Sequence, residues 1–371
     1  NPQSLDLHSD RCLLMLWKFS ARQKKQQSFL QSAQMHWEEE SRRHINHAIN
    51  AETEDDDNAL RPGDVLLNDD LGSNKMQLSA ATVWETRFKD PTLPLVIDIG
   101  CGMGISLLGL ASLNRQEDAS CNISSSGKIW AELLDLPHSN NRNFLGIDLS
   151  GLAIGYAQGV AHRWDLSGNL HFAVESAEAL LQQVSDSYPG PVSLCMIQFP
   201  TPYRLPTREE GSGGSDGAQG GNSQLPKSAL EGFMVSPKLL DLLRSILSSS
   251  ASTTKSSPSA NAAGGGKLLL QSNCEDVALW MLEAATRAGF QSTDMTVPRT
   301  EEQVRALNLD KLPQRTQNWV AMGGDRAVGD TWSAVPLIPR RGSTETEVAC
   351  RLNKTPIHRC LLTPKLNREA S

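Results

Sequence analysis

The sequence has few cysteines, and their pattern fits neither a metal site nor a disulfide framework. Seven cysteines are spread over 371 residues, with no C-x-x-C pair and no His/Cys cluster at metal-ligand spacing. Long apolar runs are also missing, since the stretch from Cys12 to Trp17 is far too short to span a bilayer. We therefore expect no metal and no membrane partner, and a reducing intracellular compartment. Nucleus, cytoplasm, plastid and mitochondrion are not distinguished by these features.

An excess of positive charge is absent as well. The formal net charge is -7 and the isoelectric point is about 5.7, so any nucleic-acid surface has to be local. A run of basic residues is either a solvated face or a phosphate-binding surface, and the pattern leaves both open. Such residues gather near the two ends of the chain: Arg22, Lys24, Lys25, Arg42 and Arg43, then Arg340, Arg341, Arg351, Lys354, Arg359, Lys365 and Arg368.

Three stretches of low complexity interrupt the chain, at about 114–143, 207–224 and 248–266. They are too polar to bury much apolar surface, which predicts disordered surface loops. Between them, strand-like and helix-like segments alternate, and this alternation predicts an α/β fold with a doubly wound, mostly parallel sheet of Rossmann-like type. The expected strands are 95–99, 143–148, 170–174, 192–199 and 267–272, and the expected helices are 104–113, 151–164, 176–185, 236–247 and 275–288.

These boundaries predict one domain, over residues 76–325. An N-terminal extension, 1–75, is expected to be partly disordered, and residues 326–371 are expected to form a basic C-terminal tail. With 39% hydrophobic residues, the chain can bury a full core in the central domain.

The segment Pro94 to Gly104, P-L-V-I-D-I-G-C-G-M-G, has the pattern of a buried strand that ends in a glycine turn. Gly100, Gly102 and Gly104 allow a tight turn and the close approach of a ligand to the backbone. A dinucleotide site would place its third glycine where Ile105 stands. An acidic residue at the strand end, as Asp98 is, suits a ligand with a cationic amino-acid portion better than a pyrophosphate. The pattern resembles the class I methyltransferases that bind S-adenosylmethionine. A tight turn without any ligand is the alternative.

The next two expected strands add candidate ligand contacts. Asp148 ends the strand N-F-L-G-I-D, where an acidic residue of a doubly wound sheet binds ribose hydroxyls. Its other interpretation is the N-cap of the following helix, a position that Ser150 also suits. Ser176 and Ala177 follow the third strand, at the turn that usually faces adenine in such folds.

The fourth expected strand ends in Phe199-Pro-Thr-Pro-Tyr203. Together with D-I-G-C-G, G-I-D and the preceding V-W-E-T-R-F-K-D-P-T-L-P-L, this segment resembles the tRNA (guanine-N7)-methyltransferase family, which are class I S-adenosylmethionine-dependent methyltransferases, and most closely the plant organellar-type members. The resemblance covers roughly residues 42–320 outside the insertions. It extends to Arg42-Arg-His-Ile-Asn46, similar to an R-x-H-x-N-P box, and to Arg315-Thr-Gln-Asn-Trp319, similar to a T-x-x-E box.

The resemblance implies S-adenosylmethionine as cofactor and tRNA as partner, with a protein subunit as a further possible partner. Asp98 would hold the methionine amino group, Asp148 the ribose, and Ser176 and Ala177 the adenine. Thr201, the candidate catalytic residue, stands where the family has the aspartate of F-P-D-P-W. The base pocket would comprise Thr201, Tyr203, Arg204, Asn273, Thr316 and Gln317.

The chain departs from the family on the substrate side. Asn273 replaces a family aspartate, Trp319 replaces a glutamate, and the family's basic run is missing after Arg204. Guanine N7 has a free lone pair, so methyl transfer needs alignment rather than a general base. The sequence leaves two alternatives open. One is a non-catalytic paralogue that binds tRNA or stabilises a partner, and the other is an amino-methyltransferase of N-P-P-Y type, for which the proline spacing is wrong.

Overall fold

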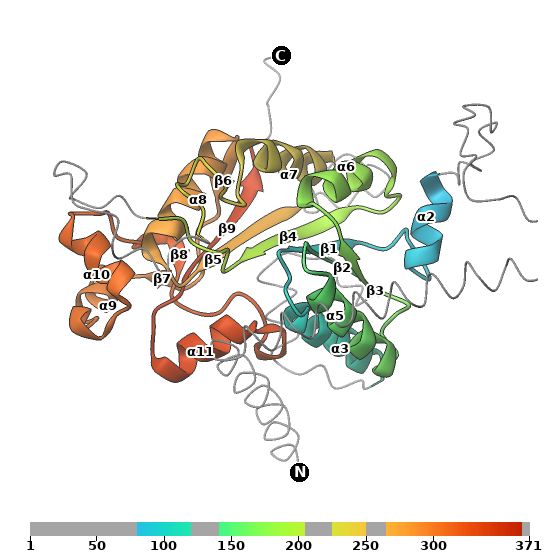
Figure 1. Ribbon diagram of the computed structural model, residues 1–371, viewed down its shortest axis with the longest axis horizontal. Coiled ribbons are helices and arrows are strands. Elements are labelled where there is room, and N and C mark those ends of the chain that lie inside the picture. Colours follow the sequence, from blue (N-terminus) through green and yellow to red (C-terminus); the bar gives the residue numbers. More distant parts are fainter. Residues whose placement is uncertain (1–79, 120–140, 205–224, 250–264, 366–371) are drawn as a thin grey trace, which may run out of the picture. The chain divides into compact units, whose positions relative to one another are not determined.

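A seven-stranded sheet runs through the computed structural model, which describes residues 80–119, 141–204, 225–249 and 265–365 (Figure 1). The strand order is β3-β2-β1-β4-β5-β9-β6, and the first five strands are parallel. β9 is antiparallel to both of its neighbours. The strands of this sheet are β1 (Leu95–Ile99), β2 (Asn143–Asp148), β3 (Leu170–Val174), β4 (Val192–Gln198), β5 (Lys267–Ser272), β6 (Phe290–Ser292) and β9 (His358–Pro364).

Helices cover both faces of the sheet, with α6, α7 and α8 on one side and α3, α5 and α11 on the other (Figure 1). Among the described residues, no helix combines the length and the apolar character that crossing a membrane requires. The helices are α2 (Ala80–Arg87), α3 (Ile105–Ala119), α5 (Gly151–Arg163), α6 (Ala177–Ser187), α7 (Pro237–Ser249), α8 (Glu275–Arg287), α9 (Glu301–Arg305), α10 (Gln314–Ala321) and α11 (Glu345–Asn353), with short 3-10 turns at Leu309–Lys311 and Arg340–Gly342.

The two-sided cover explains why the central strands are almost continuously apolar. All five residues of β1 are buried, as expected for a parallel strand with helices on both faces. On one face Ile97 and Ile99 join the main core with α7. α7 contributes Leu240, Leu243 and Leu247, whose spacing places them along one side of a helix.

β1 and β4 lie side by side at the centre of the sheet, and the chain leaves them in opposite directions. After β1 it enters α3 on one face, and after β4 it reaches α7 on the other. Such a switch point leaves a crevice outside the carboxyl ends of the strands, where doubly wound folds bind ligands. The glycine turn after β1 and the F-P-T-P-Y segment after β4 therefore adjoin the same crevice.

The structure confirms the doubly wound, mostly parallel fold, and β1, β2, β3 and β5 have the predicted bounds. One predicted loop boundary is wrong, because α3 continues to Ala119 instead of ending at residue 113. Residues such as Arg115, Gln116 and Glu117 are polar but favour helix, so polarity alone placed the loop too early. The rest of the predicted loops, the extension 1–75 and the box at Arg42–Asn46 lie largely outside the described residues.

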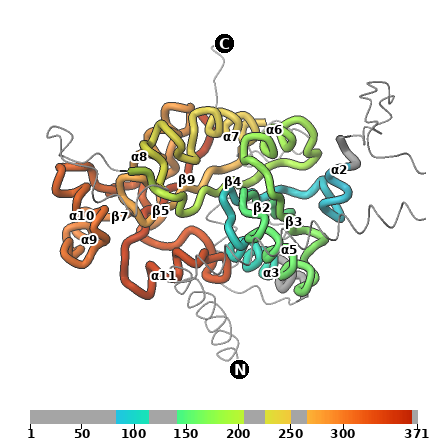
Figure 2. Tube along the Cα trace, viewed as in Figure 1, coloured from blue at the N-terminus to red at the C-terminus, as the bar shows by residue number. Residues whose placement is uncertain are grey.

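The predicted basic tail is also wrong, because most of residues 326–371 belongs to the fold. β8 (Gly329–Ser333) pairs with β7 (Pro298–Arg299), and β9 lies between β5 and β6 within the main sheet. Figure 2 shows β9 beside β5, although the two strands are far apart in sequence. The prediction of a tail relied on the basic residues of this segment. One of them, Arg359, is buried and pairs with Glu347 at 3.0 Å.

Candidate functional site

The glycine turn after β1 is held against the end of β2 by backbone hydrogen bonds. Gly100, Gly102 and Gly104 all have positive φ, between +54° and +73°, which side chains disfavour. Gly102 N donates to Asp148 Oδ2 at 2.9 Å, and Gly100 N donates to Ile147 O at 2.8 Å. A Cβ atom on Gly102 would meet nothing within 4 Å, so this glycine faces open space. The turn is thus fixed by hydrogen bonds to the end of β2, and the space next to Gly102 is open.

A cavity of about 310 Å³ lies beside this turn, at the carboxyl ends of β1, β2 and β3. Four predicted cofactor residues line it: Gly100, Asp148, Ser176 and Ala177. Asp98, Gly102 and Gly104 do not line it. Sequence reasoning missed Leu149, which also lines the cavity and is 76% exposed, an apolar side chain left open to a ligand. The other lining residues are Ile99, Ile147, Glu175, Glu178, Met234 and Leu239.

Asp148 is not the N-cap of the next helix, because Ser150 takes that position. Ser150 is the N-cap of α5, its hydroxyl accepting from Ala153 N at 3.3 Å. Asp148 Oδ1 accepts from Ser150 N at 2.8 Å, so each of its oxygens accepts one backbone N–H. A carboxylate oxygen accepts more than one hydrogen bond, which leaves acceptor capacity for hydroxyl groups in the cavity. Ser176, by contrast, caps α6 by accepting from Ala179 N at 3.2 Å.

Asp98 lies in the interior, 1% exposed, two residues before Gly100. Its Oδ2 accepts a hydrogen bond from Gln198 Nε2 at 3.1 Å, while Oδ1 has no hydrogen-bond partner among the described residues. Burial raises the pKa of this carboxyl to about 7, against the lowering effect of the Gln198 hydrogen bond; Glu345 and Asp148 raise it further. An unpartnered buried acceptor of this kind suits a cationic group.

Strained backbone marks the end of β4. Phe199 has φ +51°, a value that is a true outlier for a bulky side chain, and its N donates to Gln271 O at 2.8 Å. Such strain persists where the surrounding structure enforces it, often at binding sites. Beside it, Gln271 Nε2 donates to Gln198 Oε1 at 2.7 Å, which extends the polar row that begins at Asp98. Nothing in the sequence pattern indicated this row.

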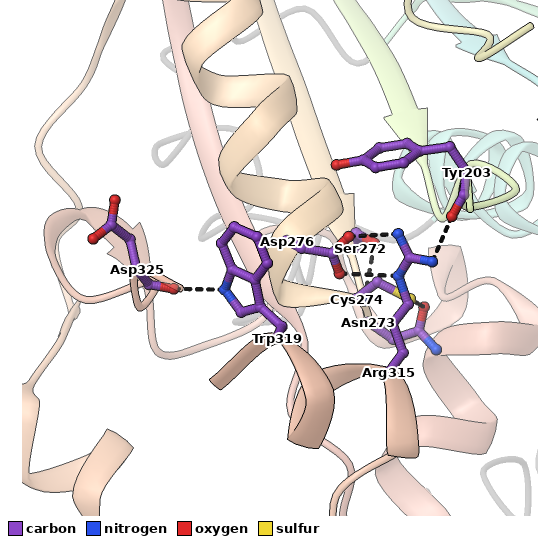
Figure 3. A network of polar contacts seen from close by, with 8 residues as sticks. All are labelled: Tyr203, Ser272, Asn273, Cys274, Asp276, Arg315, Trp319 and Asp325. Atoms are coloured by element: carbon purple, nitrogen blue, oxygen red, sulfur yellow. Dashed lines mark hydrogen bonds and ion pairs between the residues drawn. The ribbon is translucent and has the colours of Figure 1, made fainter. Parts of the chain in front are cut away.

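A second cavity, of about 460 Å³, lies where the segment after β4 meets α8 and α10. Tyr203 and Arg204 line it, as predicted for a base pocket, and so do Trp280, Trp319 and Asp276. Figure 3 shows the contacts around it: Trp319 Nε1 donates to the backbone oxygen of Asp325 at 2.8 Å. The cavity is within the roughly 300–1,000 Å³ range of small-ligand sites.

Arg315 contacts two lining residues of the second cavity, Asp276 and Tyr203 (Figure 3). Its Nε donates to Asp276 Oδ1 at 3.0 Å and its Nη2 to Asp276 Oδ2 at 2.5 Å, a two-point pair with a fully buried carboxylate. The same guanidinium lies 5.1 Å from the centre of the Tyr203 ring and donates to the Tyr203 carbonyl. Arg315 is the first residue of the segment that resembles a T-x-x-E box, but that segment does not predict its pairing with Asp276.

The other predicted substrate residues lie elsewhere. Thr316 is 1% exposed and lines neither of the two cavities described above. Gln317 Nε2 donates to the Leu312 carbonyl at 2.8 Å, which stabilises the preceding turn. Thr201 is exposed and Asn273 is half-buried, and neither lines these cavities. The predicted roles of these four residues in binding a substrate base stay predictions.

No protein-family model and no curated protein matches the chain. Solved structures with some likeness include a SAM-dependent methyltransferase from Geobacter sulfurreducens in complex with S-adenosyl-L-homocysteine, 16% identical, with a TM-score of 0.28 over 77% of this chain and 90% of the other. A second, from Thiobacillus denitrificans and in the same complex, is 14% identical, with a TM-score of 0.27 over 77% and 91%. The cyclase SpnF is 12% identical, with a TM-score of 0.31 over 77% and 79%.

Proposed function

We propose that this protein transfers a methyl group from S-adenosylmethionine to N7 of a guanine in tRNA. The main support is a hydrogen bond that connects the turn after β1 to the end of β2. Gly102 N donates to Asp148 Oδ2 at 2.9 Å, beside the 310 Å³ cavity. This contact adjoins the switch-point crevice between β1 and β4, where doubly wound folds bind ligands. The substrate half of the proposal rests on the F-P-T-P-Y segment and the aromatic cavity next to it.

The residues present fit the chemical groups of the cofactor. Asp148 has acceptor capacity for the ribose hydroxyls, and Leu149 and Ala177 offer apolar contact to an adenine ring. The unpartnered Oδ1 of Asp98 suits the methionine ammonium group. When bound, the cofactor supplies an electrophilic methyl group on a sulfonium. The protein's part is to align that methyl with the acceptor, since N7 carries no proton to remove.

The second cavity suits a purine base. Tyr203, Trp280 and Trp319 bring three aromatic side chains to its wall, and bases of single-stranded RNA stack on such rings. Trp319 stands where the resembled family has a glutamate. We infer that stacking contributes more to base binding in this chain, and carboxylate hydrogen bonds contribute less.

One observation favours the non-catalytic alternative, a tRNA-binding or partner-stabilising subunit. The side chain of Asp276, in the wall of the second cavity, is fully buried, and both of its oxygens accept hydrogen bonds from Arg315. The N1–H and N2–H edge of a guanine would then find fewer acceptors there than in the family. A protein of this kind would bind cofactor and RNA without turnover.

The two functions are separated by methyl transfer from labelled S-adenosylmethionine to bulk tRNA, followed by nucleoside analysis. We expect the label in 7-methylguanosine, and we expect Asp148→Ala to abolish transfer by removing the ribose contact. Arg163→Gln, a change at an exposed residue of α5 that lines neither cavity, is the control. Cofactor binding without labelled tRNA would establish the non-catalytic alternative. Label in another nucleoside would refute the N7 assignment alone.

A further inference from the structure

A third cavity, of about 410 Å³, lies away from the two described above, between β7, α9, α11 and the start of β9. Its charged lining residues are Arg299, Arg351, Arg359 and Glu347, so three cations face one anion. This excess of positive charge stands out in a chain whose formal net charge is -7. Two of the arginines, Arg351 and Arg359, fall in the segment that the sequence predicted to be a basic C-terminal tail.

The acidic partner of this cluster is already engaged. Glu347 Oε1 accepts from Arg359 Nη2 at 3.0 Å, and both side chains are more than nine-tenths buried. That pair is neutral as a whole, so Arg299 and Arg351 are the two lining cations without an ion-pair partner of their own among the described residues. Glu275, which pairs with Arg326, attracts Arg299 without forming an ion pair with it. Arg351 is exposed at its edge, where Nη2 donates to Ser343 Oγ at 3.0 Å.

Arg299 is the most unusual member, because it is 7% exposed and has no carboxylate in direct contact among the described residues. Its Nη1 bonds to His358 Nδ1 at 2.7 Å. Burial, together with Arg299 and two other arginines, lowers the pKa of His358 well below its ordinary value, so the ring is a neutral acceptor. Burial also lowers the pKa of Arg299, the Glu275 carboxylate raises it, and Arg326 and Arg359 lower it. These arginines repel one another, and a bound anion would relieve that repulsion.

We propose that this cavity binds a phosphate group, held by Arg299 and Arg351 at its wall and mouth. Guanidinium groups match phosphate oxygens in geometry and form charge-assisted hydrogen bonds with them. Gln303 and Ser333, which also line the cavity, add neutral polar groups that bond to phosphate oxygens. The phosphate belongs either to an RNA backbone or to a small phosphate compound, and the proposal does not depend on methyl transfer.

Calorimetric titration of inorganic phosphate into the full-length protein, at constant ionic strength, tests the site. We expect saturable binding that Arg351→Gln weakens by about tenfold or more, the effect of losing one charge-assisted hydrogen bond. Arg299→Gln should weaken it at least as much if its melting temperature shows that it folds. Arg287→Gln on α8, which removes an equal charge from a residue that does not line this cavity, should bind phosphate like wild type. No binding by wild type, or equal affinity in wild type and Arg351→Gln, overturns the proposal.

Salt-dependent binding of a tRNA transcript, followed by fluorescence anisotropy, identifies the source of the phosphate. If the RNA backbone occupies the cavity, Arg351→Gln lowers the slope of log affinity against log salt by about one contact. An unchanged slope, with inorganic phosphate binding still dependent on Arg351, assigns the site to a small phosphate compound. Both results differ from failure of the proposed methyl transfer, because neither experiment includes the methyl donor.

Discussion

Asp98 shows how one residue links the stability of the fold to its chemistry. Burial raises its pKa to about 7, whereas an aspartate in an unfolded chain has a pKa of about 3.9. The folded protein therefore binds a proton that the unfolded chain has lost between these two values. The contribution of Asp98 to stability is fully present below pH 4 and is lost as the pH rises through 7. A cation that binds the charged carboxylate offsets the loss of stability that burial of this charge causes at high pH.

Asp98→Asn should remove this dependence without changing the shape of the side chain. We expect the variant to be more stable than wild type at pH 8, by on the order of a few kcal/mol, and the difference to shrink towards pH 5. Urea unfolding of both proteins from pH 5 to 8 measures it. Glu345, whose pKa burial also raises, leaves a smaller slope in the variant. If the free energy of unfolding changed with pH by the same amount in both proteins, Asp98 would have an ordinary pKa.

In the turn between β1 and α3, two glycines have different roles: Gly104 is needed for folding, whereas Gly102 is open to a ligand. A Cβ on Gly104 would lie 2.4 Å from the Phe172 ring, whereas one on Gly102 would meet nothing within 4 Å. We expect Gly104→Ala to cost about 2–5 kcal/mol, from overpacking and positive φ together. Gly102→Ala should cost about 1–2 kcal/mol, from positive φ alone. Urea denaturation of the two variants checks this order, and equal losses would contradict the geometry.

The elements also show what the sequence could and could not predict. β1, β2, β3 and β5 were predictable because apolar runs and following glycine or acidic residues mark their ends locally. The pair of Arg315 with Asp276 was not, since it joins α10 to α8 across a distance that no local pattern encodes. Trp280 was missed for the same reason: an aromatic residue on a helix looks like core until its neighbours are known.

For the whole molecule, β9 determines where the domain ends. It pairs with β5 on one side and β6 on the other, and Cys360, Leu361 and Leu362 are buried. A chain cut after residue 325, the boundary predicted from sequence, should therefore lose cooperative unfolding, because two strands lose their neighbour and a core is opened. Urea unfolding followed by circular dichroism tests this, with a chain lacking only residues 366–371 as control. A cooperative transition in the shorter chain would show that the sheet is stable without β9.

The central claim is that the crevice above the glycine turn binds S-adenosylmethionine, and calorimetry tests it most directly. We predict binding of one equivalent by the full-length protein, and at least a tenfold loss in Gly102→Leu, whose side chain would occupy the open space over the turn. Asp148→Ala should weaken binding through the ribose, while Arg287→Gln should not change it. Absence of binding by wild type at millimolar cofactor, or full affinity in Gly102→Leu, would contradict the account.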